Sequence, residues 1–181
     1  MAGDSFEHIV RTLLEQDGYW VRQSFKVDLT RAEKASIGRP TMPRPEIDLL
    51  ALDFKRNRVT LVEVKSYLDS PGVALVDVKQ SHDTPQGRYK LFTCKKYEDV
   101  VIRSLRRMLE LEGMANATTE FRLGLVFGRI ASKDALPLAL YARSRRWFFW
   151  SAKQVKRRLV AQSLRKYEND PAIISAKLLL R

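Results

Sequence analysis

The sequence is poor in cysteine, and that shortage narrows its chemistry. Cys94 is the only cysteine among 181 residues, so an intramolecular disulfide and a multi-cysteine zinc site are both excluded. A lone cysteine is most often a small buried hydrophobic residue. This usage is compatible with a reducing compartment, and we expect a cytoplasmic protein.

Long apolar runs are also missing. No run approaches the roughly 18 residues that a membrane-spanning helix needs, and the early acidic residues Asp4 and Glu7 do not fit a secretion signal. We therefore expect a protein that is not associated with a membrane. The length and the 45% hydrophobic content suit one domain with a full core.

Acidic residues are scarce relative to basic ones. The chain has 33 Lys and Arg against 21 Asp and Glu, a formal net charge of +12. Such an excess favours a polyanionic partner, with nucleic acid as the leading candidate. Ribosomal-type binding or binding to a membrane surface would give a similar total, so charge alone does not identify an enzyme.

Much of the positive charge falls near the C-terminus, where no acidic residue occurs between Asp134 and Glu168. Lys153, Lys156 and Arg157 have helical spacing and would present one helix face to phosphates. The basic residues of this stretch are Arg143, Arg145, Arg146, Lys153, Lys156, Arg157, Arg158, Arg165 and Lys166.

A β-hairpin is predicted in the first third of the chain. Residues 47–54 and 59–64 are mostly apolar, and the polar residues 55–58 between them suit a tight reversal. We expect the loop to close symmetrically about Arg56 and Asn57.

This register places three charged side chains on one face of the hairpin. Asp48 would face Lys65 and lie diagonal to Glu63, close enough for the three to converge on one ion or phosphate. A slip of one residue would move Asp48 to the other face.

Two carboxylates at such a separation suit a hard divalent cation such as Mg²⁺, which can activate water and stabilise charge on a phosphate. The alternative is a surface salt bridge between Lys65 and Asp48. The apolar residues around Glu63, including Leu61 and Val62, instead indicate a central strand. A carboxylate is costly there, which points to a function.

The letters P-E-I-D at residues 45–48 and E-V-K at residues 63–65 resemble the signature of the PD-(D/E)XK nuclease superfamily. The resemblance implies that Asp48 and Glu63 bind Mg²⁺, that Mn²⁺ can substitute, and that the backbone carbonyl of Val64 is a further ligand. It also implies that Lys65 acts at the attacking water. Families in this group often carry a Glu on the first helix, and Glu7 fits that place.

The resemblance leaves several roles open. Glu7 would equally well favour the positive end of its helix, and Glu46 between the Pro and the Asp has no assigned role. Many relatives place a Gln or Lys on the following helix. The candidates for that place are Lys79, Gln80 and Gln86.

Periodicity predicts the remaining elements. We expect a helix over residues 4–17 with Asp4 or Ser5 as N-cap, a strand over 19–27, a helix ending at Gly113 and a strand over 121–127. Residues 29–44 are predicted to be a basic loop, in which Arg39 and Arg44 would contact a phosphate backbone. Beyond residue 132 we expect an apolar piece and then a helix from about Ser151.

The predicted fold class is α/β, with a restriction endonuclease-like α-β-β-β-α-β core whose central mixed sheet is flanked by helices. Residues 1–130 would form the nuclease-like core domain, and residues 131–181 a basic C-terminal strand-helix extension packed on the same domain. Residues 147–150 are all aromatic, which favours strand core over stacking on unpaired bases.

The expected function is a Mg²⁺-dependent endonuclease that hydrolyses phosphodiester bonds in DNA, of restriction, junction-resolving or repair type. The expected catalytic residues are Asp48, Glu63, Lys65 and Glu7. RNA remains open as a substrate, and a homodimer would suit double-strand cutting. The alternative is a non-catalytic nucleic-acid-binding subunit that retains the fold.

Overall fold

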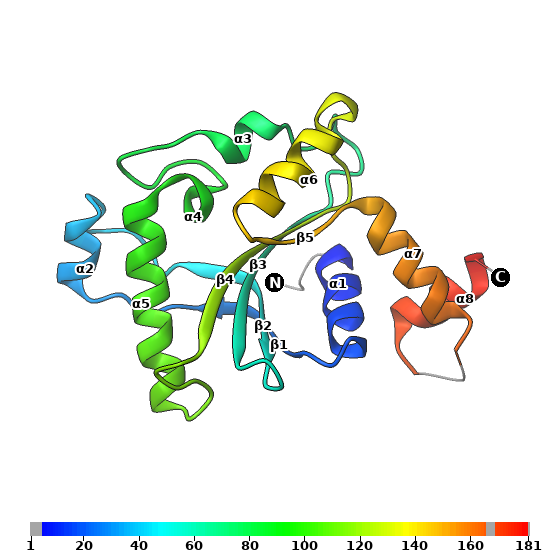
Figure 1. Ribbon diagram of the computed structural model, residues 1–181, viewed down its shortest axis with the longest axis horizontal. Helices are drawn as coiled ribbons and strands as arrows, with labels where there is room; N and C mark the ends of the chain where they lie inside the picture. The colour runs from blue at the N-terminus through cyan, green and yellow to red at the C-terminus, as the bar shows by residue number, and fades with distance from the viewer. Residues whose placement is uncertain (1–4, 166–168, 181) are drawn as a thin grey trace.

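The computed structural model describes residues 5–165 and 169–180, so Asp4 and Lys166 of the expectations above lie outside the described residues. It is an α/β arrangement in which helices flank a five-stranded sheet (Figure 1). The sheet order is β1-β2-β3-β4-β5, antiparallel from β1 to β3 and parallel from β3 to β5. The predicted mixed sheet is therefore confirmed. The strands are β1 (Trp20–Lys26), β2 (Glu46–Asp53), β3 (Arg58–Lys65), β4 (Glu120–Phe127) and β5 (Phe148–Trp150).

Helices cover both faces of the sheet. In Figure 1, α5 and α2 lie on one side, and α1, α7 and α8 lie on the other. The helices are α1 (Ser5–Gln16), α2 (Arg31–Ser36), α3 (Leu75–Lys79), α4 (Lys90–Thr93), α5 (Lys95–Leu111), α6 (Ala135–Ser144), α7 (Ala152–Ser163) and α8 (Pro171–Leu180), with a 3₁₀ turn η1 (Ser132–Asp134) before α6.

The core divides into two clusters because strand side chains alternate in direction. Leu50 and Leu61 point toward α5, and Leu49 and Val62 point toward α1. β3 is buried on both faces and occupies the middle of the sheet, as its apolar sequence indicates. Asp48 shares the face of Leu50, so it lies on the α5 side.

The expectation of a loop throughout residues 29–44 is wrong, because α2 lies within it. Thr30 and Glu33 form a capping box: the Glu33 amide donates to the Thr30 hydroxyl, and the Thr30 amide donates to the Glu33 carboxylate. Burial would raise the pKa of Glu33, but hydrogen bonds from Thr30, Ser104 and Arg107 outweigh it and lower that pKa to about 2. Glu33 therefore fastens α2 to α5 as a carboxylate.

The hairpin register also differs from the expectation. Leu50 pairs with Leu61 and Asp53 with Arg58, two residues away from the symmetric closure. Asp53 causes the change, because its carboxylate accepts the Arg56 amide at 3.1 Å and the Arg56 guanidinium at 2.8 Å and so closes the turn earlier. A shift of two residues preserves the faces. By extension of this register, Asp48 lies opposite Glu63 and diagonal to Lys65.

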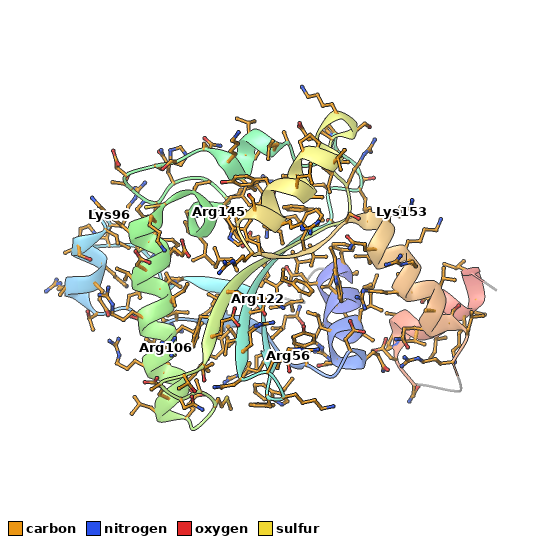
Figure 2. All side chains as sticks on the ribbon, viewed as in Figure 1. Arg56, Lys96, Arg106, Arg122, Arg145 and Lys153 are labelled. Carbon is orange, nitrogen blue, oxygen red and sulfur yellow. The ribbon has the colours of Figure 1, made fainter. Side chains whose placement is uncertain are left out.

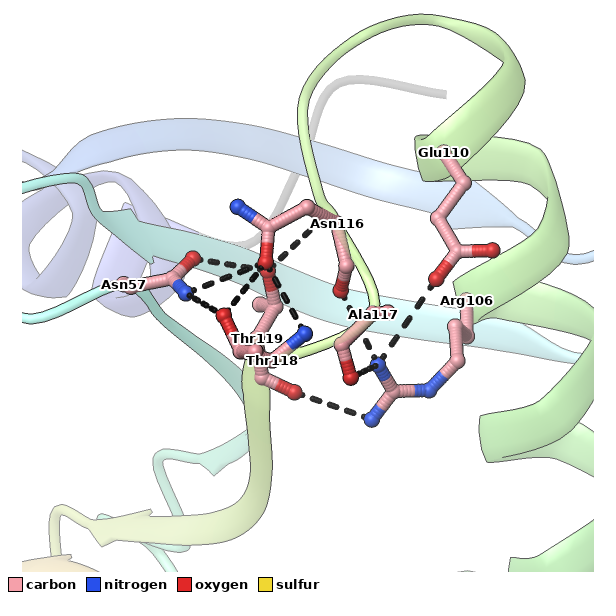
Figure 3. Close-up of polar contacts among 7 residues, drawn as sticks. All are labelled: Asn57, Arg106, Glu110, Asn116, Ala117, Thr118 and Thr119. Atoms are coloured by element: carbon pink, nitrogen blue, oxygen red, sulfur yellow. Dashed lines mark hydrogen bonds and ion pairs between the residues drawn. The ribbon is translucent and has the colours of Figure 1, made fainter.

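A polar clamp fixes the hairpin turn at the start of β3 and β4 (Figure 3). Asn57 donates to Asn116 at 3.2 Å and to Thr118 at 3.0 Å, and it accepts from the Thr119 hydroxyl at 2.7 Å. The Arg106 guanidinium reaches across from α5 to the carbonyl of Thr119 at 2.9 Å. The clamp holds these two strands in register at the end opposite Lys65.

The aromatic segment near the C-terminus is core, as predicted. Trp150 is buried, and Trp147 packs edge-on against Phe92 and Tyr141. The adjoining helix α7 begins with Ser151 in a capping box with Gln154. Within the part of the chain that is described, no helix has the length and apolarity to cross a membrane.

Because Asn57 forms the centre of the clamp and has a φ of 48°, we expect its substitution to lower the stability of the fold. Asn57→Ala should lower the free energy of unfolding by about 2–3 kcal/mol, since it loses three hydrogen bonds and puts a Cβ-bearing residue with no polar side chain in the left-handed region. Asn57→Gly should lose about 1–2 kcal/mol, because glycine accepts that backbone conformation. Urea unfolding measures both changes.

The exposed neighbour Lys55 provides the control, and Lys55→Ala should change stability by less than about 0.5 kcal/mol. Equal stabilities for the Asn57→Ala and Lys55→Ala proteins would show that the clamp contributes nothing.

Candidate active site

Three charged side chains meet at the C-terminal end of β3. The Lys65 ammonium lies 2.7 Å from the Asp48 carboxylate and 2.9 Å from the Glu63 carboxylate. Only 18% of the Asp48 side chain and 15% of the Glu63 side chain are exposed. The two carboxylates therefore lie within two hydrogen-bond lengths of each other and share one partly buried cation.

Asp48 reaches this position because the strand pairing ends beside it. The last pair between β2 and β3 is Leu49 with Val62, and beyond it the Asp48 carboxylate accepts the Val64 amide at 2.8 Å. On the other side of β2, Ser24 takes a φ of 51° and interrupts the ladder between β1 and β2. The Asp48 side chain thus takes the place of a strand partner for the Val64 amide, and this hydrogen bond fixes its carboxylate.

The backbone carbonyl of Val64 is directed toward the Asp48 carboxylate. The carbonyl groups of successive residues along a strand point toward opposite neighbouring strands. The Lys65 carbonyl accepts the Gly128 amide at 2.9 Å on the β4 side, so the Val64 carbonyl is directed toward β2 and Asp48. Two carboxylates and one main-chain oxygen therefore converge.

Gly128 allows the chain after β4 to approach the end of β3. A Cβ at this position would collide with the carbonyl oxygen of Ser66. Only glycine permits this approach, which sets the position of Lys65 through the bond to the Gly128 amide.

The electrostatics follow from burial and proximity. Burial, and then the nearby charge of Asp48, raise the pKa of Glu63 to about 7 despite the opposing effect of Lys65. Burial would lower the pKa of Lys65, but the two carboxylates outweigh it and raise that pKa above its ordinary value. Lys65 therefore keeps its charge, while Glu63 gains or loses its proton near neutral pH.

A cavity of about 460 Å³ lies directly over Asp48 and Glu63. Its basic lining residues are Lys26, Arg44, Arg88 and Lys90. Glu46 is a further acidic lining residue, so the acidic pair shares the pocket with four basic side chains and one more acid. The basic side chains attract anions.

Of the other residues predicted for the site, Glu7 and Arg39 lie apart from the acidic pair, whereas Arg44 lines the same pocket. Glu7 is on α1, which packs against the opposite face of the sheet, and its carboxylate accepts from Gln23 at 3.1 Å. Arg39 donates to the carbonyl of Pro85 at 3.2 and 3.0 Å. Arg44 lines the pocket and forms an ion pair with Asp28 at 3.2 Å.

The predicted basic face of α7 also lies away from the acidic pair. Lys153, Lys156 and Arg157 are exposed, but α7 packs on the α1 side through Val155. In Figure 2, Lys153 on α7 and Lys96 on α5 lie on opposite sides of the sheet. A long ligand that occupies the pocket would therefore contact these three residues through a different part of its length.

Sequence reasoning missed Arg88, Lys90 and Tyr97, which line the pocket. Arg88 and Lys90 come from the stretch between the hairpin and α5 that carries no clear periodicity, while Tyr97 already marks the apolar stripe of α5. The three open candidates do not line this pocket: Gln80 and Gln86 line a neighbouring one, and Lys79 ends α3.

The donor set fits a hard divalent cation. In the described ranges 5–165 and 169–180, no group of three or more His, Cys, Asp or Glu side chains lies together. An ion here would use the carboxylates of Asp48 and Glu63, the Val64 carbonyl and water. All of these are oxygen ligands, which Mg²⁺ prefers.

Comparisons with known proteins add little. No family model matches the chain, and no curated protein does. The chain is similar to a crystal structure of a protein of unknown function, AF1548, with 12% identity and a TM-score of 0.46. The match covers 90% of this chain and 71% of that one.

The raised pKa of Glu63 predicts a pH dependence of stability. A carboxyl group whose pKa is higher in the folded state than in the unfolded state stabilises the fold when protonated. Relative to Glu63→Gln, the wild type should lose on the order of 3 kcal/mol of unfolding free energy as the pH rises from about 4.5 to beyond 7. Urea unfolding in chelator, without metal, measures this difference.

The control is Glu15→Gln, which alters an exposed ion pair with Arg11. Its difference from the wild type should stay nearly constant over the same pH range. A difference between wild type and Glu63→Gln that rises with pH would contradict the assigned environment.

Proposed function

We propose that this protein is a metal-dependent nuclease of the PD-(D/E)XK type that hydrolyses phosphodiester bonds in DNA. The observation that carries the proposal is the contact of one ammonium, Lys65, with two partly buried carboxylates, Asp48 and Glu63. These are the residues of the sequence motif, and the two carboxylates line a pocket that also carries four basic side chains.

The ion would be Mg²⁺, with Mn²⁺ able to replace it, held by Asp48, Glu63 and the carbonyl of Val64. When bound, it supplies activation of a water molecule and stabilisation of negative charge on the phosphate. The Asp48 carboxylate is already positioned by the Val64 amide at 2.8 Å, so this ligand needs little rearrangement.

Lys65 has a different task. Its ammonium balances both carboxylates in the absence of a divalent ion. With a divalent ion held by the carboxylates, the ammonium would be available to hold a phosphate oxygen or to orient the attacking water. In the metal-free protein the two acids raise its pKa against the effect of burial, so the ammonium stays charged.

The sheet supports the same proposal. With the short helices α2, α3 and α4 set aside, the order α1, β1, β2, β3, α5 and β4 gives a helix, three antiparallel strands, a helix and a parallel strand, which resembles a restriction endonuclease-like core. The acidic pair lies on β2 and on β3, the central strand. Residues beyond 131 add β5 to this sheet and carry the exposed cations of α7, which would contact DNA outside the pocket.

Removing either key side chain should abolish cleavage. Asp48→Asn keeps an oxygen for the Val64 amide but loses a charge, and Lys65→Ala removes the ammonium. Each should reduce cleavage of DNA in Mg²⁺ by at least about a hundredfold. The measurement is a time course on plasmid, duplex, branched and single-stranded DNA.

Asp99→Asn serves as the matched control, because Asp99 is an exposed carboxylate on α5 that pairs with Lys95 at 2.8 Å. It should cleave at the wild-type rate. Full activity in Asp48→Asn or in Lys65→Ala would overturn the assignment.

Metal binding separates the enzyme from a non-catalytic DNA-binding subunit. Titration calorimetry with Mn²⁺ should show binding to the wild type, weakened at least about tenfold in Asp48→Asn. Lys65→Ala should still bind the ion, since no ligand is lost. Absence of binding to the wild type would leave the DNA-binding subunit as the better account.

A further inference from the structure

The pocket over the acidic pair is small and has three distinct walls. One is formed by residues 42–48, one by the stretch from Arg88 to Leu91, and one by α5 through Tyr97 and Val101. Its volume of about 460 Å³ falls in the lower part of the range for sites that enclose small ligands, roughly 300–1,000 Å³. Asp48 and Glu63 form part of its lining rather than standing on an open surface.

The walls are tied to each other and to the sheet. The Arg39 guanidinium makes two hydrogen bonds to the Pro85 carbonyl, at 3.2 and 3.0 Å, and so links the segment before the first wall to the segment before the second. The Val27 amide donates to the Pro45 carbonyl at 2.8 Å. The pocket is therefore preformed, and opening it would break these bonds.

The lining combines two kinds of chemistry. Met42, Leu91 and Val101 supply apolar surface, and Arg88 and Lys90 supply positive charge. Arg88 is exposed at the rim, and the Lys90 ammonium lies 5.7 Å from the centre of the buried Tyr97 ring. A nucleotide has the matching parts, since its base is flat and largely apolar on its faces and its phosphate is an anion.

The depth of the acidic pair limits how DNA can reach it. Asp48 and Glu63 are more than four-fifths covered and line the pocket, so we expect a phosphate to reach them through it. In a duplex the base beside that phosphate is stacked and paired, so it can occupy the 460 Å³ pocket only by leaving the stack. An unpaired nucleotide can enter alone, as in enzymes that take a base out of the stack.

We propose that this pocket binds one unpaired nucleotide next to the scissile phosphate, so that the substrate is DNA with unpaired nucleotides rather than a perfect duplex. The inference rests on the nuclease function proposed above. Extruding a base from a perfect duplex costs a few kcal/mol, and 1.4 kcal/mol corresponds to a factor of ten. Single-stranded DNA and a duplex with one bulged nucleotide should therefore be bound and cut at least tenfold better than the perfect duplex.

The test combines binding and cleavage of these three labelled DNAs of equal length. Met42→Trp should fill the pocket and reduce the preference for unpaired DNA to less than threefold, both in the dissociation constant and in the cleavage rate. Leu111→Trp places the same side chain at an exposed position at the end of α5 and should keep the full preference. Circular dichroism and thermal unfolding verify that both variants fold.

The outcomes separate this inference from the nuclease proposal. Equal binding and equal cleavage of all three DNAs by the wild type would overturn the pocket assignment and leave the nuclease standing. A preference in binding that Met42→Trp removes, without cleavage of any DNA, would support the pocket and overturn the nuclease. A preference that survives in Met42→Trp would place recognition of unpaired DNA elsewhere and contradict the inference.

Discussion

The site depends on one electrostatic constraint, that two carboxylates on the central strands need a shared cation. Asp48 and Glu63 are too covered to rely on water, and Lys65 lies within 2.9 Å of both. Burying charge without a partner costs several kcal/mol, so this arrangement persists only where the fold enforces it. The end of the β2–β3 ladder, the turn at Asp53 and the close approach at Gly128 enforce it together.

A divalent ion can replace Lys65 as the cation that balances the charges of Asp48 and Glu63. The ammonium satisfies the acids in the metal-free protein, and the raised pKa of Glu63 shows that one positive charge only partly compensates for burial and for Asp48. A doubly charged ion would compensate more fully, with Lys65 then available to a phosphate. The stability of the free protein and its proposed chemistry therefore depend on the same three side chains.

The sequence was sufficient for the parts that depend on periodicity. The apolar residues around Glu63 predicted a central strand, and the four aromatics from Trp147 predicted strand core. The hairpin register failed because Asp53 closes the turn with its side chain, an effect that symmetric loop closure ignores. The capping box of Thr30 and Glu33 was legible as a Thr-x-x-Glu pattern. The pocket depends on distant contacts such as that between Arg39 and Pro85, which no local pattern encodes.

The most direct test of the central claim is a crystal structure with Mn²⁺, read from the anomalous scattering of the ion. The account predicts one strong peak within coordination distance of the Asp48 and Glu63 carboxylates and of the Val64 carbonyl, with the Lys65 ammonium moved away from at least one acid. A structure at saturating Mn²⁺ with no peak there, and with Lys65 still bonded to both carboxylates, would contradict it.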